Sequence, residues 1–176
     1  CSSECIREVA TWTKLDPPTP ILAQDGGLVY DLHRRRLVRF GGGSPQTAVV
    51  MEHDGRQWSQ LLREGINARL GFAMVYHALR RRSVVFGGFG DGQDQSDTWE
   101  YDGQRWTKVN AGAGPKARRS PAATYDAGRG EMVLFGGILR PSVGPAGGRP
   151  DGGPGGGGGG GAGPPSQEPT VYGDTW

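Results

Sequence analysis

The sequence has few of the features that would assign a chain to a chemical class at once. It has only two cysteines, Cys1 and Cys5, which are too few for a disulfide framework. It has no run of 18 apolar residues, so no membrane-spanning helix is expected. The net charge of +2 is too small to indicate a nucleic-acid surface by itself. No signal peptide is visible, so a secreted or periplasmic location would require a leader upstream of Cys1.

Motifs for catalysis and for metal binding are missing as well. The sequence contains no Gly-x-Ser-x-Gly, His-Glu-x-x-His or Walker motif. The histidines at positions 33, 53 and 77 are not at metal-ligand spacing. The acidic segment Asp91–Asp97 is spaced somewhat like a calcium loop, but it lacks the glycine and terminal glutamate of an EF-hand. We therefore interpret that segment as a solvated loop, and we assign no catalytic residue, cofactor or metal ligand.

What the sequence does contain is a repeat. The stretch Val84–Gly88 is echoed at Leu37–Gly42 and Met132–Gly137, and the glycine pairs are 46 and then 49 residues apart. A Tyr-Asp or Tyr-His precedes each copy, and Asp-Gly-x-x-Trp follows the first two. Asp97-Thr98-Trp99 returns as Asp174-Thr175-Trp176. A fixed period of this length indicates a repeat architecture.

One unit divides into four short segments, at residues 72–76, 83–86, 97–101 and 105–109. These segments are rich in Val, Tyr, Phe, Trp and Thr, and turn residues bound them, which predicts β-strands. No convincing amphipathic helix is found. A four-stranded antiparallel unit cannot bury its faces alone, but copies stacked around a ring bury them and leave no open edge. The sequence therefore predicts an all-β chain built as a β-propeller, with glycine pairs at close backbone approaches.

The units resemble kelch repeats, which have a Gly-Gly after the second strand, a tyrosine in the third (Tyr101) and a tryptophan opening the fourth (Trp106). The period is nearer to 50 than to the roughly 40–45 of WD40 repeats. The resemblance implies a propeller of the galactose oxidase/kelch superfamily. His53 replaces the third-strand tyrosine in one unit and Met51 stands where Trp99 stands in the next, so we expect looser packing there.

The repeat also predicts the domain organisation, namely two complete and two partial blades. Residues 1–15 would end an incomplete blade, residues 16–62 and 63–110 would be whole blades, and residues 111–176 would be incomplete. Within the last, the Gly/Pro-rich residues 138–173 would be a disordered insertion, because they offer too few apolar side chains to offset the entropy of ordering. We expect a fragment whose missing blades are needed to close the ring.

Two groups of polar residues are candidate binding residues. Loops between second and third strands share one end of the blades with inter-blade loops, and binding residues often lie on loops. Candidates at this end are Arg69, Asp91, Gln93, Asp94 and Arg118. For the two arginines, the alternative is that they brace neighbouring loops by hydrogen bonds to carbonyl groups.

The second group lies on turns at the opposite end and consists of Arg34, Arg35, Arg36, Arg80, Arg81 and Arg82. The two clusters are in register, so they would form a basic patch for an acidic partner or a polyanion. Ordinary solvated turns are the alternative. No aromatic residues interleave the arginines, which argues against single-stranded nucleic acid as the partner.

Three hypotheses for function follow. The first is a non-catalytic interaction module whose loops bind a protein or a glycan. The second is a fragment of a carbohydrate-active propeller enzyme, since the resemblance includes galactose-oxidase-like copper-radical oxidases and sugar-acid isomerases. Neither Cys1 nor Cys5 suits the cysteine that such an oxidase cross-links to tyrosine. The third is polyanion binding through the arginine turns.

Overall fold

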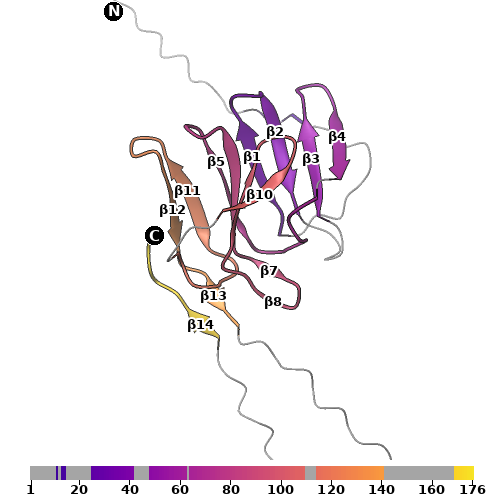
Figure 1. The fold of residues 1–176 in the computed structure, drawn as a ribbon. Coiled ribbons are helices and arrows are strands. Elements are labelled where there is room, and N and C mark those ends of the chain that lie inside the picture. The colour runs from indigo at the N-terminus through magenta and orange to yellow at the C-terminus, as the bar shows by residue number, and fades with distance from the viewer. Residues whose placement is uncertain are drawn as a thin grey trace, which may run out of the picture.

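The computed structural model describes residues 11, 13–14, 25–41, 48–62, 64–109, 114–140 and 169–176. Within these ranges the chain forms β-strands and no helix, which confirms the prediction of an all-β protein. The strands pair antiparallel in sheets of two or four strands (Figure 1). The described part of the chain thus has no helix that is long and apolar enough to cross a membrane.

The first four-stranded sheet contains β1 (Gly27–Asp31), β2 (Arg36–Phe40), β3 (Val49–His53) and β4 (Trp58–Leu62), side by side in chain order. The turn between β3 and β4 contains the expected Asp-Gly pair, and Asp54 Oδ1 accepts hydrogen bonds from the backbone amides of Arg56 and Gln57 at 2.8 Å each. Side chains alternate between the two faces of a strand. In β2 this alternation buries Val38 and Phe40 completely on one face.

The second sheet repeats the first. It contains β5 (Ala73–His77), β6 (Arg82–Phe86), β9 (Thr98–Tyr101) and β10 (Trp106–Val109). Ser83 pairs with Tyr101 at the place where Leu37 pairs with His53 in the first sheet, so the registers are equivalent. The predicted four-stranded antiparallel units are therefore present in both copies, with strand ends shifted by one residue at most in the second.

The third unit begins in the same way. Strand β11 (Ala122–Asp126) pairs with β12 (Glu131–Phe135). The backbone groups of Leu134 and Trp176 exchange two hydrogen bonds of 2.9 Å, and Thr175 forms a bridge with Phe135. Residues 174–176 thus lie hydrogen-bonded beside β12, where their likeness to Asp97-Thr98-Trp99 predicted a third strand.

The apolar core lies between neighbouring units. Phe40 of the first sheet contacts Trp106 of the second, with ring centroids 4.7 Å apart. Phe86 occupies the same position in the second sheet and packs with Ala73 against Leu134 of β12. Burial of one such aromatic side chain contributes on the order of 1.5–3 kcal/mol. The same face of each unit therefore packs against the next unit, which is the arrangement expected of a repeat.

The Gly87-Gly88 pair lies at two close backbone approaches, as predicted. Gly87 has φ +67°, and a Cβ atom there would lie 2.7 Å from the carbonyl oxygen of Arg118. A Cβ atom on Gly88 would lie 2.8 Å from the carbonyl oxygen of Leu70. Side chains cannot be accommodated at such distances, so Gly87 allows the next unit to approach this closely and Gly88 allows Leu70 of its own unit to do so.

The substitutions in the first unit do not leave exposed gaps, contrary to the expectation of looser packing. Met51 and His53 are both buried. The His53 ring lies 5.1 Å from the ring of Trp58, and Tyr101 lies 5.0 Å from Trp106 at the equivalent place. Histidine thus occupies the place of tyrosine with its ring at a similar distance from the indole, but at a steeper angle of 59° against 30°.

The segment 138–173 also differs from expectation, because its two ends are ordered strands. β13 (Ile138–Leu139) pairs with β14 (Thr170–Val171), and β7 (Phe89–Gly90) pairs with β8 (Gln93–Asp94) in the second unit. Ile138 and Phe89 form equivalent bridges, with Arg119 and Leu70 respectively. The long tract therefore expands the tip of a hairpin that has a two-residue turn in the preceding unit. Residues 141–168 lie outside the described residues, as do residues 1–10, 12 and 15 of the incomplete blade predicted at 1–15.

Candidate functional site

The two hairpins β7–β8 and β13–β14 lie at the same end of the sheets (Figure 1). They are connected through Asp94, whose carboxylate accepts hydrogen bonds from Arg119 Nε at 2.5 Å and from the backbone amide of Arg140 at 2.7 Å. The Arg119 guanidinium also lies over the Phe89 ring, 4.2 Å from its centroid. This is the end of the molecule where the loop arrangement predicted a binding face.

Arg69 holds the base of the first hairpin. Its buried guanidinium donates from Nη1 to the Gly87 carbonyl at 3.1 Å and to Asp97 Oδ1 at 2.6 Å. Its Nε atom donates to the Asn67 carbonyl at 3.3 Å. Burial alone would raise the pKa of Asp97, but hydrogen bonds from Arg69 and Trp99 outweigh it and lower that pKa below its ordinary value.

Arg118 holds the second hairpin with the same geometry. Its Nη1 atom donates to the Gly136 carbonyl at 2.9 Å and to Asp174 Oδ1 at 2.6 Å, and its Nε atom donates to the Lys116 carbonyl at 3.0 Å. The guanidinium lies 4.1 Å from the centroid of the Tyr172 ring. Hydrogen bonds from Arg118 and then from Trp176 hold the pKa of Asp174 well below its usual range.

Both arginines therefore have the contacts of the bracing alternative, rather than those of side chains directed at a ligand. Arg69 and Asp97 are 28 positions apart, whereas Arg118 and Asp174 are 56 positions apart. We call the pairs Arg69–Asp97 and Arg118–Asp174 the two arginine clamps. They have the same geometry although the second encloses 28 additional residues. The bases of the hairpins are thus fixed independently of the length of their tips.

The remaining predicted residues of this end are divided between base and tip. Asp94 is buried in the base, whereas Asp91 and Gln93 are exposed at the tip. Asp91 has φ +50° and accepts a hydrogen bond from the Asn67 side chain. Because the carboxylates at 91, 94 and 97 have different partners, they do not converge as calcium ligands. Nowhere in the described ranges do three His, Cys, Asp or Glu side chains gather as a metal site.

The arginine turns lie at the other end, and several of their charges are paired. Arg34 forms 2.7 Å ion pairs with both Asp31 and Glu52, and Arg80 lies 2.9 Å from Glu100. Arg36 is 3.9 Å from Glu52, and Arg82 donates to the Arg81 carbonyl at 3.1 Å. Arg35 and Arg81 are exposed at the tips, and both have φ +54°. The two turns are in register, as predicted, but acidic neighbours reduce the net positive potential of the patch.

A buried polar cluster next to these turns was not predicted from the sequence. Glu52 Oε1 lies 2.7 Å from Arg34 Nη1 and 3.1 Å from the hydroxyl of Tyr101 in the second sheet. Burial raises the pKa of Asp31, but hydrogen bonds from Arg34 and Tyr76 bring it below its ordinary value. The available signal was an acidic residue within β3, where alternation places Glu52 on the same face as the buried Val50. The cluster ties the first sheet to the second.

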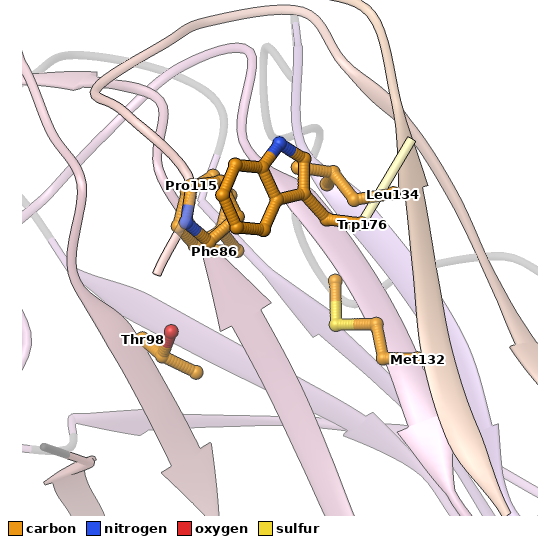
Figure 2. A pocket seen from close by; sticks show the side chains of 6 residues that line it. All are labelled: Phe86, Thr98, Pro115, Met132, Leu134 and Trp176. Carbon is orange, nitrogen blue, oxygen red and sulfur yellow. The ribbon is translucent and has the colours of Figure 1, made fainter. Parts of the chain in front are cut away.

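A small groove of about 160 Å³ opens between the second sheet and the β11–β12 hairpin. Figure 2 shows Trp176 beside it, with Met132 and Leu134 from β12 on one side and Phe86 on the other. Thr98 and Pro115 complete the lining, which contains no ionisable side chain. Such a surface can hold an apolar group, and Thr98 contributes a hydroxyl group to its lining.

The described residues define an all-β chain made of small antiparallel sheets. No protein-family model matches the chain, and no curated protein matches it. Its fold is similar to the solved structure described as "Structure of YjhT", with a TM-score of 0.56 and 15% sequence identity over 74% of this chain. The match covers 48% of that chain, so the present chain spans about half its length. At this identity the similarity concerns the fold alone.

Proposed function

We propose that this chain is a non-catalytic interaction module, an arc of a kelch-type β-propeller that presents the β7–β8 and β13–β14 hairpins to a protein or a glycan. The observation that carries the proposal is that the two hairpins have equivalent bases and different tips. Arg69–Asp97 and Arg118–Asp174 hold the bases in the same way. Rigid bases with variable tips are typical of binding loops on a scaffold.

The propeller assignment is supported by the repetition of one packing arrangement. Phe40 packs against the second sheet, and Phe86 packs in the same position towards Leu134 of the third unit. Further units added in this way would fan around an axis and cover the open faces.

A binding role, rather than catalysis, is favoured by how the ionisable groups at the hairpin end are used. The carboxylates of Asp94, Asp97 and Asp174 each form an ion pair with an arginine. These pairs fix loops to one another, so their charges are committed to the structure. The side chains displayed at the β7–β8 tip, Asp91 and Gln93, suit recognition by hydrogen bonding.

The proposal can be tested with ligands selected from a displayed peptide library and with an immobilised glycan array. The double variant Asp91→Ala/Gln93→Ala should weaken binding of the selected ligands about tenfold or more, because exposed polar tips carry the recognition. The matched control Arg35→Ala/Arg81→Ala changes two exposed side chains at the opposite end and should bind normally. Circular dichroism would establish that both variants fold. Binding lost in the control but kept in the tip variant would contradict the proposal.

A further inference from the structure

Two apolar surfaces are exposed on opposite sides of the stacked units. On β1 of the first sheet, Leu28 is 58% exposed and Tyr30 is 46% exposed. On β12 of the third unit, Phe135 is 55% exposed. The second sheet lies between these two units, since one core cluster joins it to the first sheet and another joins it to β12. Figure 1 shows β1 and β12 on the two sides of β5.

Each exposed residue has counterparts that are covered within the chain. Phe135 ends β12 as Phe40 ends β2 and Phe86 ends β6, and these two rings are only 0% and 4% exposed. Leu28 is the second residue of β1, and Met74, the second residue of β5, packs against the core between the first two sheets. The two open surfaces are therefore the two halves of the contact that already joins consecutive units.

The polar contacts between units repeat in the same register. The Tyr76 hydroxyl accepts a hydrogen bond from the His33 amide at 3.3 Å, and the Tyr125 hydroxyl accepts one from the Leu79 amide at 3.4 Å. Tyr30 is the third member of this tyrosine series, and its expected donor is the amide of Gly128, which follows Asp126 as His33 follows Asp31.

Backbone hydrogen bonds between equivalent residues of consecutive units also repeat in the same register. The Gly71 amide donates to the Asp25 carbonyl at 3.3 Å, and the Ser120 amide donates to the Gly71 carbonyl at 2.6 Å. The next step of the series would join the amide of Asp25 to the carbonyl of Ser120. The apolar residues and the hydrogen-bonding groups of the two open surfaces thus match in register.

We propose that a second copy of this chain covers both surfaces, with the β12 face of each copy packed on the β1 face of the other. The resulting dimer would have two identical contacts related by a two-fold axis. It would also remove both apolar surfaces from water. The proposal concerns the side faces of the units and does not depend on any function of the hairpins.

Sedimentation velocity of the whole chain, from low to high micromolar concentration, tests this contact. Wild-type protein should form a dimer, and Tyr30→Arg and Phe135→Arg should each reduce it to monomer because each damages both contacts. An equimolar mixture of the two variants should recover a dimer, since one undamaged contact remains. Leu79→Arg, which changes an exposed leucine on a turn of the middle unit, should leave the dimer intact.

Hydrogen exchange of the wild-type protein gives a readout that does not depend on the variants folding. Protection at β1 and β12 should rise with protein concentration, whereas protection at β5 should stay constant. A wild-type protein that remains monomeric at every concentration would overturn the proposal. A dimer that survives both arginine variants, or whose variants fail to recover on mixing, would overturn it as well.

Discussion

Replacing Arg69 with methionine should lower the free energy of unfolding by about 3 kcal/mol, because removal of one partner from a buried ion pair costs roughly 3–5 kcal/mol. Methionine retains a long flexible side chain that can fill the site. The Gly87 carbonyl and the Asp97 carboxylate, however, lose the donor that lies 3.1 and 2.6 Å away. Asp97 keeps a 2.7 Å hydrogen bond from Trp99 and has Lys108 Nζ at 3.7 Å. This remaining support places the expected cost at the lower end of the range.

The assay is urea unfolding followed by tryptophan fluorescence. With a denaturant slope of about 2 kcal/mol per molar urea, the midpoint of Arg69→Met should fall by about 1.5 M. Arg105→Met is the matched control, because Arg105 is exposed and its Nε atom lies 3.9 Å from Asp102. Its stability should change by less than about 0.5 kcal/mol.

Adding Asp97→Asn to Arg69→Met should restore part of the loss, since the amide leaves no unpaired charge at the base of the hairpin. The bracing role assigned to Arg69 would be refuted if Arg69→Met unfolded at the same urea concentration as Arg105→Met.

Two other predictions concern acid and the glycine-rich tract. The pKa of Asp97 is lower in the folded state than in the unfolded chain, so the unfolded chain takes up the proton first as the pH falls. The contribution of the Asp97 carboxylate to the free energy of unfolding is therefore present above about pH 4 and is lost as the pH falls below that value. The urea midpoint of the wild-type protein should therefore fall between pH 7 and pH 3, and the midpoint of Arg69→Met should fall less. An equal fall of the midpoint in both proteins would show that the Arg69–Asp97 pair is not the source of the pH dependence. Replacing residues 140–169 by Asp-Gly should give β13–β14 the turn of β7–β8 and raise stability by about 2 kcal/mol, because each halving of loop length recovers roughly 0.6 kcal/mol of closure entropy. A lower melting temperature by calorimetry would show that the tract itself makes stabilising contacts.

The repeat units could be predicted because their signals are local. Strand residues alternate with turn residues over a few positions, and Asp102-Gly103 is a hairpin signal that needs no distant partner. The short strands β7 and β13 were missed because two-residue strands have no period to detect. They form because their backbone groups pair with β8 and β14 and also meet those of Leu70 and Arg119.

By itself the sequence determined the all-β class, the repeat and the places where glycine is needed, because backbone sterics and side-chain alternation act over short distances. Only the tertiary structure decided what the polar residues do. Arg118 became a clamp through a partner 56 positions away, and Glu52 was paired with Arg34 and with Tyr101 of another sheet. The physical reason is that a charge or hydrogen-bonding group takes its role from the partner it meets. The number of residues between two positions does not identify that partner. The two arginine clamps have equal geometry although their partners are 28 and 56 positions apart in the sequence.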